Sequence, residues 1–187
     1  MLEKIIHLDQ ELFVFLNGLG SETYDNLWLM ITKQVNWTPL FLVVFYLIYK
    51  KLGCKNRIVI LVMIAALITI CDQGTNLVKN YFHRLRPCNN PNIKDSIRII
   101  KASDTFSFFS GHAANSMAST VFIVMILKRY YKYAGLLFLF PLIFAYSRIY
   151  LGLHFPIDII SGYIFGGILG FLCYKLFLYI QSRRQEL

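Results

Sequence analysis

Residues 56–80, NRIVILVMIAALITICDQGTNLVKN, decide the fold of this chain. The run carries no charge between Arg57 and Asp72, and its length matches the roughly 20 residues that a helix needs to cross a bilayer. We predict a membrane-spanning helix here, because a helix satisfies all of its backbone polar groups within one segment. The whole chain has the same character. Of its 187 residues 57% are hydrophobic, and the mean hydropathy of +0.54 indicates a membrane protein.

Four other apolar runs resemble this one in length. Together they predict five spanning segments, at residues 26–50, 56–80, 110–128, 133–151 and 156–180. Residues 3–18 instead alternate apolar and polar faces at helical spacing, which predicts a helix lying along the membrane surface. A sixth spanning helix, made from part of residues 1–34, is the alternative. We therefore expect one domain over residues 1–187, an all-α polytopic membrane helical bundle with five to six transmembrane helices and an N-terminal amphipathic segment.

The net charge of +9 comes from basic clusters at the ends of the apolar segments. Since these cations do not form a stripe, they argue against nucleic acid and for contact with membrane lipids. Basic connections at residues 50–57 and 128–132, and the basic tail at residues 181–184, share one side if the five segments alternate. The positive-inside rule makes that side cytoplasmic, with the C-terminus. Residues 81–109 and 152–155 would then face the periplasm or extracytoplasmic side of the cytoplasmic membrane.

Other patterns predict packing rather than chemistry. Gly162, Gly166 and Gly170 recur every four residues, a spacing typical of close helix contact in lipid. The four cysteines lack CxxC spacing, so we interpret them as buried or idle thiols. Residues 1–4 do not resemble the start of a secretory signal peptide. No pattern indicates an oligomeric state.

Three polar clusters interrupt the apolar chain at the predicted outward ends of its helices. They read Lys79-x6-Arg86-Pro87, Ser110-Gly111-His112 and Ser147-Arg148-x5-His154-x3-Asp158. Permanent cations, imidazoles and a carboxylate are costly to place beside lipid, so these clusters predict a functional site. A phosphate group explains them best, because it binds several cations and N–H donors, while one histidine can attack it and another can protonate the leaving group.

The first two clusters are each ambiguous when taken alone. Arg86 offers a planar fork to phosphate oxygens and Lys79 a point charge, but both could simply anchor a helix end among lipid headgroups. We predict that Ser110 caps the third spanning helix, that Gly111 lets a ligand approach the backbone, and that His112 lies in the first turn. An ordinary capped helix would carry the same pattern.

The third cluster discriminates best. Pro156 suits the first turn of the last helix, and this places Asp158 near the third helical position, where the dipole favours a carboxylate. From there Asp158 can bond one ring nitrogen of His154 and leave the other nitrogen free as a nucleophile. A lone pair of this kind could equally be structural, but the two other clusters favour a reaction site.

Together the three motifs resemble the type 2 phosphatidic acid phosphatase superfamily over residues 79–158. The resemblance implies that His154 is the nucleophile and forms a phosphohistidine, with Asp158 orienting it. It implies that His112 acts as general acid and then as base. The family usually has proline where this chain has Phe109, so we expect altered loop rigidity and retained chemistry.

The resemblance also implies how the phosphate is held. Lys79, Arg86 and Arg148 would stabilise its charge, with Ser110 and the N–H of Gly111 completing the cradle. We expect no cofactor and no metal, because no Asp/Glu/His cluster has ligand spacing and three cations take the place of magnesium.

Our leading hypothesis is an integral membrane hydrolase that removes phosphate from a lipid. Candidate substrates are undecaprenyl pyrophosphate, phosphatidylglycerol phosphate, phosphatidic acid and the lipid A phosphates. One alternative is a phosphatase of the same family for a soluble ester such as glucose 6-phosphate. The related vanadate-dependent haloperoxidases are soluble, unlike this chain. The other alternative is a non-catalytic membrane protein that binds anionic headgroups, which would not need two histidines and a carboxylate.

Two further groups of basic residues lie near the motifs. His83 and Arg84 could touch a headgroup or a second phosphate, or could anchor the helix end at the interface. The loop at residues 88–109 carries Lys94, Arg98 and Lys101, and it could attract anionic headgroups or be an ordinary solvated loop.

Overall fold

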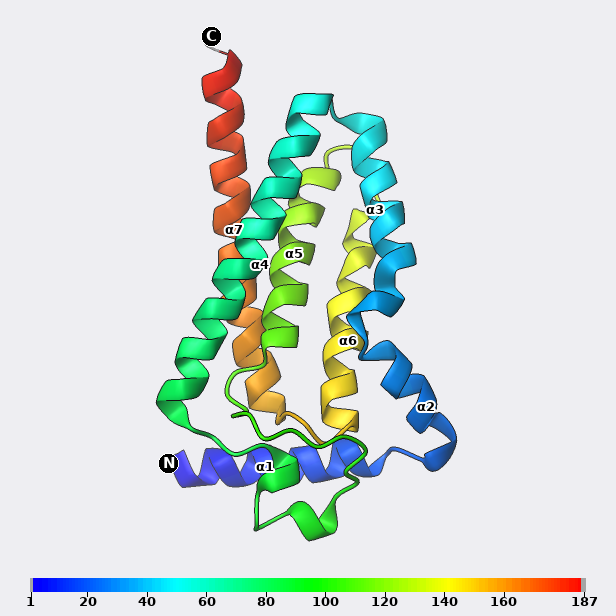
Figure 1. Cartoon of the computed structure of the whole chain (residues 1–187), viewed down its shortest axis with the longest axis vertical. Helices are drawn as coiled ribbons and strands as arrows, with labels where there is room; N and C mark the ends of the chain where they lie inside the picture. Colours follow the sequence, from blue (N-terminus) through cyan, green and yellow to red (C-terminus); the bar gives the residue numbers. More distant parts are fainter. Residues whose placement is uncertain (1, 186–187) are drawn as a thin grey trace.

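The computed structural model describes residues 2–185, which fold into a bundle of α-helices (Figure 1). The α-helices are α1 (Leu2–Gly18), α2 (Glu22–Ile31), α3 (Thr38–Lys51), α4 (Cys54–Phe82), α5 (Gly111–Leu127), α6 (Leu139–Tyr150) and α7 (Pro156–Gln185). Short 3-10 helices are η1 (Gln34–Trp37), η2 (Pro87–Asn89), η3 (Lys94–Ser96) and η4 (Ala134–Phe138). The described residues contain no strand, so the all-α class is confirmed. Met1 and residues 186–187, the ends of the predicted domain, lie outside the described residues.

Helix α1 lies across one end of the bundle, beside the α4–α5 loop and the α6–α7 turn (Figure 1). This placement favours the predicted amphipathic segment over a sixth span. The outward face of α1 is mixed, with Leu8, Phe15 and Glu11 exposed, whereas Asp9 and Asn17 are buried against the protein. Asn17 donates to backbone carbonyls of the α4–α5 loop and the end of α6, which fixes α1 on this end of the bundle.

The structure does not confirm the predicted number of five to six transmembrane helices. Within the described residues, only α4 and α7 are long and apolar enough to cross a bilayer alone. Helix α2 with η1 and α3 would make a third span, but the pair is bent by 74°. Helices α5 and α6, of 17 and 12 residues, are shorter than the roughly 20 residues of a full span.

The segment predicted to span at residues 26–50 is not one continuous helix, because the chain breaks between α2 and α3. The side chains of Asn36 and Trp37 donate to the carbonyls of Met30 and Ile31, so they satisfy the end of α2 in place of a further helical turn. Pro39 then stands in the first turn of α3, where its missing N–H costs no helical bond.

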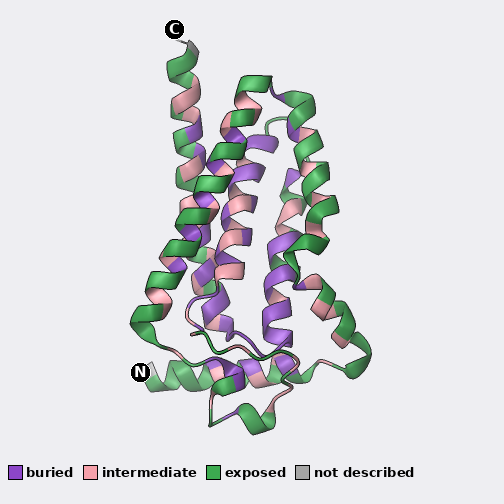
Figure 2. Ribbon diagram, viewed as in Figure 1, coloured by how far each residue is buried: buried purple, intermediate pink, exposed green. Residues whose placement is uncertain are grey.

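Helix α5 is the buried centre of the bundle (Figure 2). It packs closely on α7, because each glycine of the predicted small-residue series faces the backbone of α5. A Cβ atom on Gly162 would lie 2.7 Å from the carbonyl oxygen of Ser110, and one on Gly166 would lie 2.1 Å from that of Ala114. The predicted packing role of these glycines is confirmed.

The cysteines are unpaired. Cys71 and Cys88 are buried, Cys173 is half-buried, and Cys54 is exposed.

Candidate active site

Lys79 lies in the last turn of α4, half-buried and facing the start of α5. A Cβ atom on Gly111 would lie 3.9 Å from its Nζ, so the ammonium group faces bare backbone. The helix ends at His83, which adopts a left-handed φ of 48° and donates its N–H to the carbonyl of Lys79 at 3.0 Å. This turn ends α4, and Pro87 begins η2 farther along the chain.

Arg86 is buried and held on several sides. Its Nε and Nη2 donate to the carbonyl and the hydroxyl of Thr105, both at 2.8 Å. Its Nη1 donates to the carbonyl of Leu153 at 3.0 Å and lies 3.0 Å from Nε2 of His154. The guanidinium is therefore fixed directly beside the imidazole, so the first and third sequence clusters meet here.

The second cluster forms the expected helix start. Ser110 is buried and caps α5, its hydroxyl accepting from the N–H of Ala113 at 3.4 Å. His112 follows in the first turn, and its ring stacks on Phe144 of α6 with the centroids 5.3 Å apart. The free N–H groups of this first turn point out of the helix end, which suits an anion.

Arg148 reaches the site from the end of α6. It is buried, and its Nη1 donates to the hydroxyl of Thr32 at 2.5 Å. Within residues 2–185, its Nε has no hydrogen-bond partner although it is buried. The charges of Arg86 and Arg148 both act on Lys79, and that of Arg86 acts on Arg148, so three cations from three elements converge on one region.

His154 and Asp158 meet across the start of α7. Pro156 begins this helix as predicted, and Asp158 is its third residue. Nδ1 of His154 lies 3.5 Å from Oδ2 of Asp158, and the same oxygen accepts from the N–H of Phe155 at 2.9 Å. Both side chains are almost fully buried. The predicted contact between imidazole and carboxylate is confirmed.

The contacts of His154 determine its tautomer. A guanidinium can only donate, so Nε2, which faces Arg86, must be the acceptor nitrogen of a neutral ring. The proton then resides on Nδ1, toward Asp158. Burial lowers the pKa of His154 to about 3, with the charge of Arg86 acting in the same direction against the hydrogen bond to Asp158. The ring is therefore neutral at physiological pH, with the lone pair of Nε2 directed at Arg86.

Several residues of the site were missed by the sequence motifs. Ser107 is fully buried and donates to Oδ2 of Asp158. Arg84 pairs with Asp158 and with Asp9 of α1, so the expectation that it contacts a headgroup or anchors the interface is wrong. Thr32 lies far from the motifs in sequence, and only the bend after α2 brings it to Arg148. A single serine, threonine or aspartate carries no pattern by which sequence could find it.

The loop between α4 and α5 is mixed in character. Arg98 is half-buried and pairs with Asp25 at 2.8 Å, and its guanidinium stands over the ring of Tyr150. The guanidinium of Arg98 is therefore engaged within the protein, whereas one interpretation of the loop had this residue attracting lipid headgroups. Lys94 and Lys101 are exposed.

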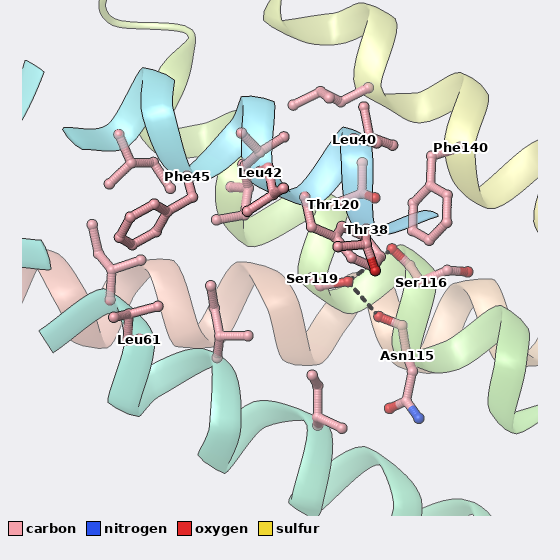
Figure 3. A pocket seen from close by; sticks show the side chains of 18 of the residues that line it. Thr38, Leu40, Leu42, Phe45, Leu61, Asn115, Ser116, Ser119, Thr120 and Phe140 are labelled. Carbon is pink, nitrogen blue, oxygen red and sulfur yellow. Dashed lines mark hydrogen bonds between the residues drawn. The ribbon is translucent and has the colours of Figure 1, made fainter. Parts of the chain in front are cut away.

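An apolar cavity of about 400 Å³ lies between α3, α4, α5 and α6 (Figure 3). One end lies beside the site, since Phe144 both lines the cavity and stacks on His112. From Ile68 the wall follows α4 back to Arg57, a rise of about 16 Å along a helix. Asn115 and Ser119 of α5 line the part nearer the site, and side chains such as Phe45 and Leu61 line the rest (Figure 3). Within residues 2–185, no group of three His, Cys, Asp or Glu side chains could hold a metal ion.

Known proteins resemble the chain along nearly its whole length. It is 32% identical to the lipid A 4'-phosphatase of Bacteroides thetaiotaomicron, with all of this chain and 84% of that protein covered. It is 26% identical to the undecaprenyl-diphosphatase of Sulfolobus acidocaldarius, with 93% of this chain and 81% of that protein covered.

Two solved structures share the fold. The phosphatidylglycerolphosphate phosphatase of Bacillus subtilis, a transmembrane protein of PAP2 type, superposes with a TM-score of 0.70 at 18% identity, over 92% of this chain and 86% of that one. LpxE of Aquifex aeolicus superposes with a TM-score of 0.67 at 22% identity, over 88% of this chain and 93% of that one. The model of the PAP2 superfamily matches residues 55–182, which include all three polar clusters. The chain is therefore a member of the PAP2 superfamily, a family of membrane phosphatases.

Proposed function

We propose that this protein hydrolyses a lipid phosphate or lipid diphosphate through a phosphohistidine formed at His154. The observation that carries the proposal is the neutral imidazole held between Asp158 and Arg86, with the lone pair of Nε2 directed at the guanidinium of Arg86. A nucleophile needs an unprotonated nitrogen, and a phosphoryl group needs fixed positive charge around its oxygens. Nε2 of His154 meets the first requirement, and the guanidinium of Arg86 beside it meets the second.

The cations would bind the phosphoryl oxygens before attack. Arg86 donates to Nε2 in the free protein, and an incoming phosphate would draw that N–H to itself and release the lone pair. Arg148 has a buried Nε able to donate to the same group, and Lys79 faces the bare backbone at Gly111. Ser110 and the N–H of Gly111 would complete the cradle.

The reaction would proceed in two displacements. Nε2 of His154 forms a bond to phosphorus while the bond from phosphorus to the leaving oxygen breaks, and His112 gives that oxygen a proton. Asp158 stabilises the positive ring through Nδ1. Water then attacks the phosphohistidine, His112 takes its proton, and the phosphorus–nitrogen bond breaks to release phosphate.

The cavity between α3, α4, α5 and α6 supports a lipid as the substrate. Its volume of about 400 Å³ suits a small-molecule site, and its apolar wall begins beside His112. The wall of about 16 Å along α4 is close to half of the roughly 30 Å hydrocarbon core of a bilayer. A hydrocarbon chain of one leaflet could therefore lie in it while the phosphate reaches His154. A soluble ester would not use this space.

The orientation of the molecule follows from its basic residues. The end of the bundle opposite the site holds the turns at residues 50–57 and 128–132 and the end of α7 (Figure 1). By the positive-inside rule that end is cytoplasmic, and the site faces the periplasm or extracytoplasmic side of the cytoplasmic membrane. Five spans fit this orientation if α5 and α6 cross inside the protein. Among substrates we favour lipid A phosphates, because lipid A 4'-phosphatases match the chain at 32% and 31% identity, with undecaprenyl diphosphate second.

The decisive experiment measures phosphate release by purified protein in detergent. The panel contains a lipid A phosphate, undecaprenyl diphosphate, a short-chain phosphatidic acid and glucose 6-phosphate. We expect release from lipids, loss of at least about a thousandfold in His154→Ala, and acid-labile phosphate trapped on the wild-type protein. Undiminished activity of His154→Ala would overturn the nucleophile, and release from glucose 6-phosphate alone would overturn the lipid substrate. Binding of lipid phosphates without any release would favour a non-catalytic headgroup protein.

A further inference from the structure

Arg84 forms an ion pair with two buried carboxylates at once. Its Nη1 donates to Oδ1 of Asp158 at 2.7 Å, and its Nη2 donates to Oδ2 of Asp9 at 2.6 Å. Neither carboxylate side chain is exposed, whereas that of Arg84 is 22% exposed. A buried carboxylate is stable only when it is paired and hydrogen-bonded, so this guanidinium decides whether both can be accommodated as anions.

Asp9 connects the surface helix α1 to the start of α7. Its Oδ1 accepts from the N–H of Ile157 at 2.9 Å, which satisfies a first-turn donor of α7 from another element. Burial raises the pKa of Asp9, and the hydrogen bonds from Arg84 and Ile157 act against that shift. Asp9 thus holds both the guanidinium and the helix that carries Asp158.

Aromatic rings pack around the same junction. The guanidinium of Arg84 stands 4.2 Å over the ring of Phe155, and this ring packs edge-on against Phe13 of α1 at 5.3 Å. Phe155 adjoins His154 in the chain. Polar and apolar contacts therefore both join α1 to the segment that carries the imidazole.

The pairing leaves each oxygen of Asp158 with its own task. Arg84 occupies Oδ1, so Oδ2 remains for Ser107, the N–H of Phe155 and the imidazole. If Arg84 were lost, the carboxylate could rotate about its terminal torsion, which is soft. Nδ1 of His154 would then lose a fixed acceptor, and the proton could move to Nε2, the nitrogen that has to attack.

We propose that Arg84 and Asp9 are positioning residues, through which the surface helix α1 holds Asp158 and thereby keeps His154 in its reactive tautomer. The proposal rests on the proposed function of His154 as nucleophile, and it extends the working site to a helix outside the three sequence motifs. Neither residue needs to touch the substrate, so both act on the rate of the reacting step rather than on lipid binding.

Kinetics of the full-length protein in detergent test this inference. The variants are Arg84→Gln, Arg84→Lys, Asp9→Asn and the double variant Asp9→Asn/Arg84→Gln. We expect kcat to fall about 100-fold in Arg84→Gln and about tenfold in Asp9→Asn, with KM within about threefold of the wild type, since small misplacements near a reacting group cost about this much. Arg84→Lys recovers part of kcat, because it restores one ion pair but not the fork. The double variant is no slower than Arg84→Gln alone, because the asparagine of Asp9→Asn keeps an oxygen for the N–H of Ile157 and the carboxylate acts on His154 through the guanidinium.

Matched control variants each remove a charge of the same sign at a residue that contacts nothing in the site. Lys94→Gln removes a cation from the loop, and Glu11→Gln removes a carboxylate from the exposed face of α1. Both retain wild-type kinetics. Thermal unfolding separates positioning from stability: if kcat falls only in proportion to the folded fraction, the role is structural and the inference fails. A kcat of Arg84→Gln within threefold of the wild type overturns it outright.

A spectroscopic measurement tests the inference without a substrate. Nitrogen NMR of protein labelled at its four histidines reports the tautomer of His154, identified by the signal missing in His154→Ala. We expect protonation at Nδ1 in the wild type and a mixture of tautomers in Arg84→Gln. An unchanged tautomer contradicts the inference. If the wild type released no phosphate from any lipid but the tautomer shifted, the proposed function would fail and the positioning contact would stand.

Discussion

The two sides of α5 differ in how closely they are packed. On the α7 side, Gly162, Gly166 and Gly170 lie against carbonyl oxygens of α5 spaced by the same four residues, and a Cβ atom on any of them would lie within 2.7 Å of backbone. On the α3 and α4 side, large apolar side chains leave a cavity of about 400 Å³. The second polar cluster lies at the N-terminal end of α5, where Gly162 packs on one side and Phe144 of the cavity wall stacks on His112. A reacting imidazole needs fixed neighbours, and a lipid chain needs space. The close packing on the α7 side of α5 meets the first need, and the cavity on the α3 and α4 side meets the second.

The largest effect is expected from disturbing the close side. In Gly166→Ala the new methyl group would lie 2.1 Å from the carbonyl oxygen of Ala114, and backbone cannot yield as a side chain can. We expect a loss of about 3 kcal/mol of stability. In the protein that remains folded, we expect about a 100-fold loss of phosphate release, because the cap at Ser110 moves with α5.

Gly167→Ala is the matched control for this variant. A methyl group there would meet only the side chain of Met117, at 3.9 Å. Thermal unfolding and phosphate release should both stay close to the wild type, with a change in stability of at most about 0.5 kcal/mol. Equal behaviour of the two alanine variants would show that the contact between α5 and α7 is not as close as described.

A smaller and more selective effect is expected from filling the open side. Ile64 lines the cavity, so Ile64→Trp should occupy space intended for a hydrocarbon chain. We expect KM for a long-chain lipid phosphate to rise about tenfold, while kcat/KM for a water-soluble aryl phosphate stays unchanged. Ile164→Trp, at an exposed position of α7, should leave both substrates unaffected. Equal losses on both substrates would argue against the cavity as a lipid site.

The smallest effect concerns the pH dependence of folding. The pKa of His154 is about 3 in the folded protein and about 6.5 in an unfolded chain. Below pH 6.5 the unfolded chain therefore binds a proton at this residue that the folded protein does not bind, and this favours unfolding. Its stabilising contribution is complete above pH 6.5 and is lost as the pH falls toward 3. Between pH 7 and pH 5.5 we expect a loss of about 1 kcal/mol from this residue.

Thermal unfolding at these two pH values measures that loss. His154→Asn should show a smaller difference between pH 7 and pH 5.5 than the wild type does. His7→Asn, at an exposed histidine of α1, should retain the wild-type difference. An identical slope in all three proteins would mean that His154 is not held neutral by its surroundings.

Local signals predicted much of this molecule. Ser110 caps α5, Pro156 begins α7 and the glycines pack at four-residue spacing, because each of these depends on the chemistry of a few neighbouring residues. The helix over residues 26–50 is broken in the structure, and hydropathy could not predict this, because it does not register a bend of 74° held by side-chain bonds to backbone. Helix α1 was predicted as amphipathic, but the burial of its polar Asp9 and Asn17 against the bundle was not.

By itself the sequence determined that the chain enters a membrane, that its polar residues gather at helix ends, and that three motifs suited to phosphate chemistry stand in order. These properties follow from hydropathy, capping and spacing, which are local. Only the tertiary structure decided that Arg84 belongs to Asp158 and Asp9, that Ser107 and Thr32 join the site, and that an apolar cavity lies beside His112. Contacts between residues far apart in the chain depend on how whole helices pack, and no short stretch of sequence carries that information.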